Sequence, residues 1–123
     1  MLKLSKKTEK TFKDACKKTG HPEIIDLSSM PEKMRDQAMA EYMLKVITEA
    51  KNDGWVADYK DENQRKWIPW FNFSPSGARF TFSSSCCSAA AAGRAARLCF
   101  KNEATSDAAG KELVDLYEIA ING

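Results

Sequence analysis

Two adjacent cysteines, Cys86 and Cys87, have the clearest potential for metal or redox chemistry in this chain. Zinc sites favour cysteines separated by two residues, because both thiolates can then point at one ion. Neighbouring residues in a strand instead point to opposite faces, and the single histidine, His21, is distant in sequence. We therefore expect no metal site and no cofactor, and we expect Cys99 to serve as a small buried hydrophobe.

The sequence gives as little support for a catalytic site as for a metal site. A serine or cysteine nucleophile usually needs a base, most often histidine, and His21 stands in a proline-linked connector. Asp58, Asp61 and Glu62 could provide paired carboxylates for acid–base chemistry, but this polar stretch is typical of a solvated loop. Glycine-rich phosphate-binding motifs are absent. The sequence predicts a protein that is not an enzyme, with an enzyme as the third-ranked alternative.

Aromatic and basic residues form the better candidate site. Nucleic-acid bases stack on exposed aromatic rings flanked by Lys or Arg, and the stretch RKWIPWF at 65–71 has that composition. Residues 1–18 add seven lysines against two carboxylates, which suits phosphate or an acidic protein. A solvated lysine face and a buried aromatic core are the plain alternatives. The candidate binding residues are Arg65, Lys66, Trp67, Trp70, Arg79, Lys10, Lys13 and Lys17.

Size and composition limit the remaining classes. The chain has 123 residues, 43% apolar and 29% charged, which predicts one globular domain over 1–123, with residues 1–10 free to fray. Its net charge of +2 does not by itself indicate a nucleic-acid partner. The sequence shows neither a secretory leader pattern nor a long apolar run. We expect a cytoplasmic protein with reduced cysteines and no membrane contact.

Helix signals stand at both ends of the chain. Residues 5–18 form a predicted helix that Ser5 caps and Gly20 ends. A second helix is predicted to start with Ser29 as its N-cap and to end at 52–54, with Gly54 suited to the left-handed C-cap position. Asn102 is predicted to cap a last helix over about 103–120. The second helix carries an apolar face of Met34, Ala38, Met39, Tyr42, Met43, Val46, Ile47 and Ala50.

Three strands are predicted between these helices. Residues 66–73 place Trp67, Phe71 and Phe73 on one face and Trp70 on the other, and proline at 69 indicates an edge strand or a bulge. A type I turn at 74–77 leads to a strand over 78–83. Residues 84–94 have the composition of a mobile loop, and 96–101 read as a third strand. The fold class is α+β, in the order α-α-β-β-β-α, with helices on one face of a small antiparallel sheet.

Five segments in series carry a resemblance to a family. They read TFKDAC at 11–16, MPEK at 30–33, ITEAKNDGW at 47–55, NQRKWIPWF at 63–71 and RLCFKNEATSDAAGKEL at 97–113. The chain resembles a family of small uncharacterised proteins from prophages and mobile elements of gut bacteria, over about residues 11–119. It departs from the family at Ala95 and Ala96, where Gly-Ser is usual, and in VADY at 56–59. The resemblance implies a genomic context and no assigned activity.

Together these observations predict a non-catalytic accessory protein of a phage or mobile element that acts as a small binding module. A protein partner is favoured, and an edge strand that pairs with its copy would make a homodimer. A nucleic-acid-binding protein that uses the basic first helix and the aromatic hairpin is the alternative.

Overall fold

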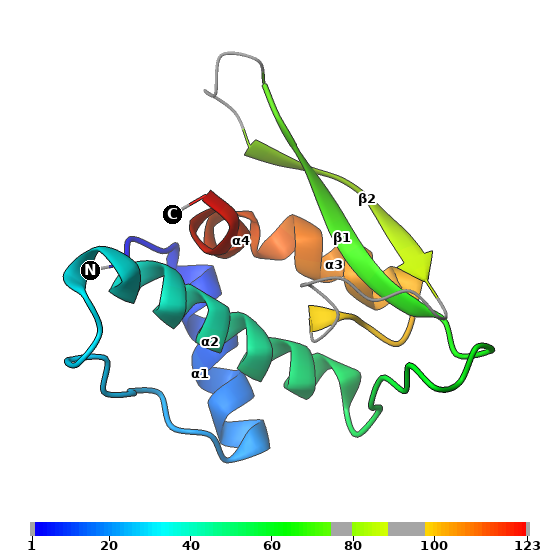
Figure 1. Cartoon of the computed structure of the whole chain (residues 1–123), viewed down its shortest axis with the longest axis horizontal. Helices are drawn as coiled ribbons and strands as arrows, with labels where there is room; N and C mark the ends of the chain where they lie inside the picture. The colour runs from blue at the N-terminus through cyan, green and yellow to red at the C-terminus, as the bar shows by residue number, and fades with distance from the viewer. Residues whose placement is uncertain (1, 75–79, 89–97, 123) are drawn as a thin grey trace.

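The computed structural model describes residues 2–74, 80–88 and 98–122 (Figure 1). In chain order the elements are α1 (Lys6–Thr19), α2 (Glu32–Asn52), β1 (Lys66–Phe73), β2 (Phe80–Ser88), α3 (Glu103–Glu112) and α4 (Val114–Asn122). The α+β class is confirmed. The predicted element order is not, because a third strand is missing from the described residues and the last helix is divided into two.

Helix α1 begins and ends where its capping residues predict. The Ser5 hydroxyl accepts a hydrogen bond from the Thr8 backbone N–H, and Gly20 ends the helix with a φ of 82°. Phe12, Ala15 and Cys16 are buried, and this apolar stripe packs on α2.

The N-terminal segment contacts the core and α4. Leu2 and Leu4 pack against the core, and Asp115 of α4 accepts hydrogen bonds from the Ser5 backbone N–H at 2.9 Å and the Thr8 hydroxyl at 2.8 Å. These contacts connect the beginning of α1 to α4, and the prediction that residues 1–10 can fray stays a prediction.

Helix α2 is the central element, and its beginning differs from the prediction. The helix starts at Glu32, after Pro31, so Ser29 is not its N-cap. The reason is a local turn in which the Met30 N–H bonds to the Leu27 carbonyl, while the Arg35 guanidinium donates to the carbonyl of Met30. At the other end Asp53 takes the left-handed C-cap position and Gly54 follows with a positive φ.

The two strands form an antiparallel hairpin with an irregular register. Trp70 pairs with Ser84 and Phe71 pairs with Phe82, so Ser83 is the additional residue of a bulge. On β1 the register shifts between Trp70 and Phe71, close to Pro69. An irregularity near this residue was predicted because proline has no N–H to donate to the strand ladder. β2 extends to Ser88, so residues 84–88 are strand rather than loop. The predicted turn at 74–77 and loop positions 89–94 lie largely outside the described residues.

The predicted third strand is reduced to a single bridge. Phe100 exchanges two backbone hydrogen bonds with Trp67, at 3.0 and 2.7 Å, and the described residues on either side of it do not continue the ladder. Asn102 then caps α3 by accepting from the Thr105 N–H at 2.8 Å. The expected single helix over 103–120 breaks at Leu113, whose ψ is 28°.

The helices cover one face of the hairpin. Ser85 of β2 donates a hydrogen bond to Asp107 of α3 at 2.6 Å, and the Phe71 ring lies 4.8 Å from the Tyr117 ring of α4. At Gly110 of α3 an added Cβ would lie 2.3 Å from the Phe82 ring. The hairpin therefore rests on α3 and α4, as Figure 1 shows.

One core joins the helices and this face of the hairpin. The buried members of this core include Met43, Ile47, Phe80, Phe100, Leu113 and Leu116, and the half-buried Met39 and Leu98 pack against them. Met34, expected on the buried face of the second helix, is exposed, as is Ile24 of the connector. Within the described ranges, none of the helices has both the length and the apolar character that a membrane span requires.

Candidate functional site

The face of the hairpin that turns away from α3 and α4 is the strongest candidate site. We call it the outer hairpin face and define it by Trp70, Asn72, Thr81, Ser84 and Cys86, all of them exposed. Trp70 retains 55% of its surface, the largest exposed fraction of any tryptophan here. None of the five residues is charged.

The Trp70 ring lies beside Cys86 on this face. Its indole nitrogen contacts the Cys86 sulfur, which is a diagonal cross-strand contact because Cys86 pairs with Ile68. An exposed tryptophan ring buries a large apolar area when a partner covers it, so it can act as an anchor for binding.

Trp67 does not share the outer hairpin face. Its backbone pairs with Phe100 and with Cys87, and its side chain is half-buried. The two tryptophans that the sequence grouped as one candidate surface therefore have different roles. Trp70 is available to a partner, and Trp67 joins the hairpin to the segment before α3.

Lys66 is a correction to the predicted surface, because its side chain is only 2% exposed. Its ammonium donates to the Asp61 carbonyl at 3.0 Å and lies 4.8 Å from the centre of the Tyr59 ring. The polar segment before β1 folds over this lysine. Strand alternation cannot predict such a contact, since it depends on where a neighbouring loop returns.

The same loop joins Cys99 to a buried cluster. Tyr59 donates to the Cys99 sulfur at 3.8 Å. Burial, together with the neighbouring thiol, raises the pKa of Tyr59 to about 12, and burial also raises the pKa of the Cys99 thiol. A protonated, buried thiol is a poor nucleophile. The prediction that Cys99 is a buried hydrophobe is confirmed.

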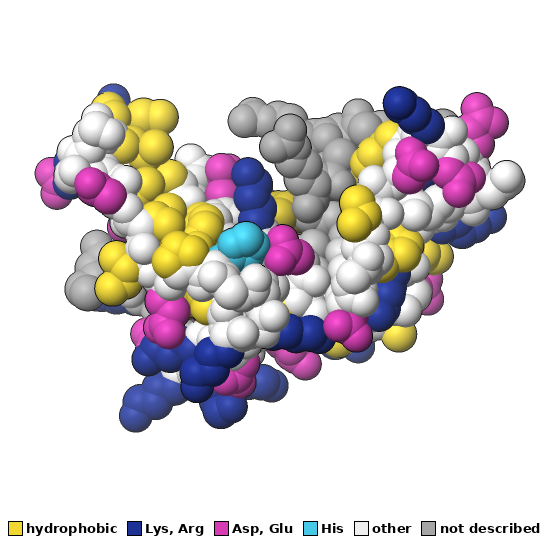
Figure 2. Space-filling model, turned by 90° about the horizontal axis from the view of Figure 1, so that it is seen from below, with side chains coloured by type: hydrophobic (Ala, Val, Ile, Leu, Met, Phe, Trp, Pro, Cys, Tyr) yellow, Lys and Arg dark blue, Asp and Glu magenta, His cyan; other side chains and the backbone are white. Residues whose placement is uncertain are grey.

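The remaining basic candidates lie apart from the outer hairpin face. Arg65 is exposed, but its guanidinium donates to the Cys87 sulfur at 3.3 Å. Lys10, Lys13 and Lys17 are exposed on α1, which Figure 1 places on the other side of the molecule from the hairpin. Arg79 lies outside the described residues. Figure 2 shows the face seen from below, where Lys and Arg side chains gather mainly at one corner with carboxylates among them.

The side chains of the adjacent cysteines Cys86 and Cys87 contact different residues. Cys86 contacts Trp70 on the outer hairpin face, whereas Cys87 contacts Arg65. Across the described parts of the chain, no three His, Cys, Asp or Glu side chains come together in a way that could hold a metal ion. His21 is exposed and pairs with Glu49 at 3.1 Å, and Asp58 and Asp61 accept hydrogen bonds from their own loop.

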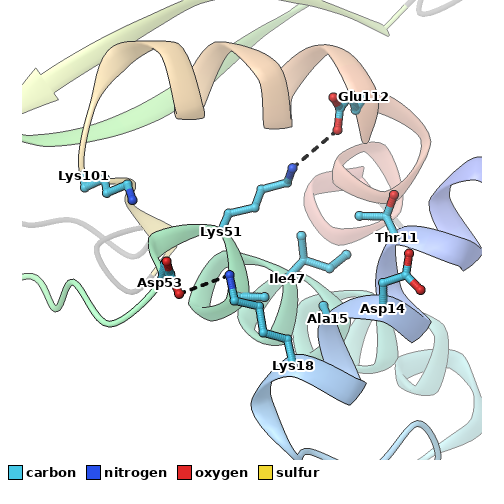
Figure 3. A pocket seen from close by; sticks show the side chains of 10 residues that line it. Thr11, Asp14, Ala15, Lys18, Ile47, Lys51, Asp53, Lys101 and Glu112 are labelled. Carbon is cyan, nitrogen blue, oxygen red and sulfur yellow. Dashed lines mark hydrogen bonds and ion pairs between the residues drawn. The ribbon is translucent and has the colours of Figure 1, made fainter.

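A charged pocket between α1, α2 and α3 was not predicted from the sequence (Figure 3). It has a volume of about 410 Å³ and an apolar floor that includes Ile47. Lys51 pairs with Glu112 at 3.4 Å, and Lys18 pairs with Asp53 at 3.2 Å. The carboxylates that line this pocket balance its lysines in number, so it has no excess charge that would select an anion.

Comparisons of the chain with protein-family models, with curated proteins and with solved structures gave no match. The functional argument therefore depends on the geometry described above.

Proposed function

We propose that this chain is a non-catalytic binding module that recognises a protein partner through the outer hairpin face. The observation that carries the proposal is the exposed ring of Trp70 on a face that the described helices leave open. Tryptophan is among the residues most enriched at the energetic centres of protein interfaces. The resemblance to mobile-element proteins supports an accessory role in a phage or mobile element, in the cytoplasm.

The backbone of β2 offers the partner a second kind of contact. Within the described residues, β1 is the one strand that pairs with β2, so along residues 80–87 the other edge of β2 has no described strand beside it. An extended segment of a partner can add to such an edge by strand pairing, while side-chain pockets give specificity. A second copy of the chain is one partner that could pair in this way.

Charge favours a protein over a nucleic acid. Phosphate contacts supply most of the affinity of proteins for nucleic acids and require several Lys or Arg side chains. The outer hairpin face has no charged residue, Lys66 is buried, and the lysines of α1 lie on the other side of the molecule. Among the residues that the structure describes, the nucleic-acid alternative therefore lacks a single surface that combines exposed aromatic rings with several cations.

The test compares three forms of the protein in a pull-down from the native host. Trp70→Ser removes the anchor, and Ile24→Ser removes a side chain that is 86% exposed and stands on the connector after α1. We expect one partner with the wild type and with Ile24→Ser, and its loss with Trp70→Ser. Equal recovery by all three forms would contradict the proposal.

A gel-shift assay with single- and double-stranded DNA tests the alternative. Binding that weakens steeply between low and moderate salt indicates phosphate contacts. We expect no shift at moderate salt. A salt-sensitive shift that is lost when Lys10, Lys13 and Lys17 are replaced by Gln would favour the nucleic-acid function instead.

A further inference from the structure

The two sides of the hairpin differ in what lies beside them. On the side of β1, Trp67 bonds to Phe100 through the backbone. On the side of β2 that is away from β1, no described strand lies along residues 80–87, and we call this backbone the β2 edge. Natural proteins often protect such an edge with lysine or proline. Residues 80–87 read FTFSSSCC and contain neither, nor any other charged residue, so their composition does not oppose pairing with another strand.

The side chains of β2 fall on two faces, and the bulge at Ser83 changes their alternation. The face toward the helices is buried or half-buried and carries Phe80, Phe82, Ser85 and Cys87. The outer hairpin face is exposed and carries Thr81, Ser84 and Cys86. The even-numbered residues before the bulge therefore face the helices, and after it the odd-numbered residues do.

This alternation selects one antiparallel register for two copies of β2. Residues that oppose each other in a sheet have their side chains on the same face, and a slip of one residue turns them to opposite faces. One register keeps the faces matched over the whole of residues 80–87. Its opposed pairs are Phe80 with Cys87, Thr81 with Cys86, and Phe82 with Ser85.

The bulge favours a second copy over a regular strand. A bulge twists an edge strand and disturbs its pairing with a regular neighbour. In the register above, Ser83 of each copy meets Ser84 of the other at the twofold axis. Two residues then oppose two, and the pairing resumes on both sides of the axis.

Helix α3 gives this pairing a reciprocal arrangement of charge. Asp107 accepts a hydrogen bond from Ser85 at 2.6 Å. One helical turn further on, the Lys111 ammonium lies 5.9 Å from the centre of the Phe82 ring. Because Ser85 of one copy opposes Phe82 of the other, the register brings Asp107 of each copy toward Lys111 of the other. The acid and the base meet twice, once on each side of the twofold axis.

The spacing between the two α3 helices fits the same arrangement. An added Cβ at Gly110 would lie against both Phe82 of β2 and Pro69 of β1, so α3 lies beneath the middle of the hairpin. Pairing of the two β2 edges separates the hairpin centres by two strand spacings, about 9.6 Å. Helices pack at interaxial distances of about 8–10 Å, so the two copies of α3 can lie side by side.

We propose that two copies of this chain associate through their β2 edges into one four-stranded antiparallel sheet, with Asp107 of each copy paired to Lys111 of the other. The inference rests on the part of the proposed function that gives the β2 edge to a partner, and it names that partner as a second copy. Trp70 stands on β1, away from the new strand contact. The dimer therefore leaves both outer hairpin faces available to another protein.

Sedimentation equilibrium of the purified chain, over about 1 μM to 1 mM, tests the association and its charges. We expect a reversible dimer. Asp107→Lys and Lys111→Asp should each weaken it about tenfold, because like charges then face each other. The double variant restores opposite charges and should regain most of the affinity, and the exposed Ile24→Ser should not change it. A chain that stays monomeric, or a double variant no tighter than the single ones, would overturn the proposal.

A disulfide cross-link tests the register independently of the charge variants. Thr81→Cys places a thiol opposite Cys86 of the other copy, whereas the two positions lie too far apart along one strand to bond within a chain. Glutathione disulfide is the oxidant: the two thiols form one disulfide, and glutathione disulfide is reduced to two glutathione molecules. We expect a covalent dimer joined between positions 81 and 86, identified by peptide mapping. No covalent dimer, or a bond between the two Cys86 thiols in the wild type, would contradict the register.

This inference and the proposed function can fail separately. Sedimentation uses the purified chain alone, so a monomer would leave the dependence of the host pull-down on Trp70 untouched. A pull-down that does not depend on Trp70 would likewise leave a dimer with the expected charge dependence standing.

Discussion

Gly110 fixes how closely α3 approaches the hairpin, and Gly110→Ala is the perturbation that tests this packing. An added Cβ would lie 2.3 and 2.6 Å from two carbons of the Phe82 ring and 3.0 Å from the Pro69 Cβ. The ring must move, although Phe71 packs against it edge-on at 6.1 Å between ring centres. Overpacking of this kind costs about 1–3 kcal/mol, and the better helix propensity of alanine returns about 1 kcal/mol. We expect a net loss of up to about 2 kcal/mol.

Urea denaturation followed by circular dichroism measures this loss, and a double-mutant cycle identifies its cause. Phe82→Ala removes the ring that the new methyl group meets. In that background the clash with the ring is gone, so Gly110→Ala should stabilise the protein by up to about 1 kcal/mol. The coupling energy between the two positions is then the overpacking cost of about 1–3 kcal/mol. If Gly110→Ala stabilises the wild type, or if its cost is the same in both backgrounds, the close contact between α3 and the hairpin is wrong.

Three further predictions concern α4 and the tyrosines. Asp115→Ala leaves the buried Thr8 hydroxyl without its acceptor and should cost about 2 kcal/mol in urea denaturation, whereas Asp14→Ala removes an exposed ion pair and should leave the midpoint unchanged. Tyr117→Phe removes a buried hydroxyl that has no partner among the described residues and should raise the free energy of unfolding by up to about 1 kcal/mol; a loss of similar size would show that the hydroxyl has a partner. Because the pKa values of Tyr59 and Tyr117 are raised in the folded state, their contribution to stability is complete below the unfolded pKa near 10 and decreases at higher pH. Stability that stays flat between pH 9 and 11, or a native tyrosinate absorbance titration centred near pH 10, would contradict these shifts.

Local signals in the sequence predicted the ends of several elements correctly. Ser5, Gly20 and Asn102 act through hydrogen bonds or dihedral angles within a few residues of themselves, so their roles can be read without the tertiary fold. Pro69 likewise indicated an irregular strand, and a bulge follows it. These are the parts of the structure that short-range chemistry determines.

Features that depend on tertiary contacts were not predictable in the same way. The Ser- and Cys-rich segment 84–88 has the composition of a loop, but backbone pairing with β1 makes it a strand, because sheet context outweighs intrinsic propensity. The break at Leu113 turns α4 so that Tyr117 meets Phe71, and no helix-breaking residue marks it.

The candidate site was predicted in part. Strand alternation correctly placed Trp70 on the face opposite Phe71, and this residue is the centre of the proposed interface. The prediction that Lys66 lies on the binding surface was wrong, because the loop that carries Tyr59 and Asp61 covers its side chain. The pocket lined by residues of α2, β1 and α4 could not be predicted, since these elements are distant in sequence and meet only in the fold.

The central claim, that the outer hairpin face binds a protein, is tested most directly by photocrosslinking in the native host. A benzophenone amino acid placed at Ser84, an exposed position that pairs with Trp70, is compared with the same amino acid at Ile24. The account predicts one discrete protein adduct from position 84 that disappears when Trp70→Ser is added, and no such adduct from position 24. The absence of an adduct at position 84, or equal adducts at both positions, would contradict it.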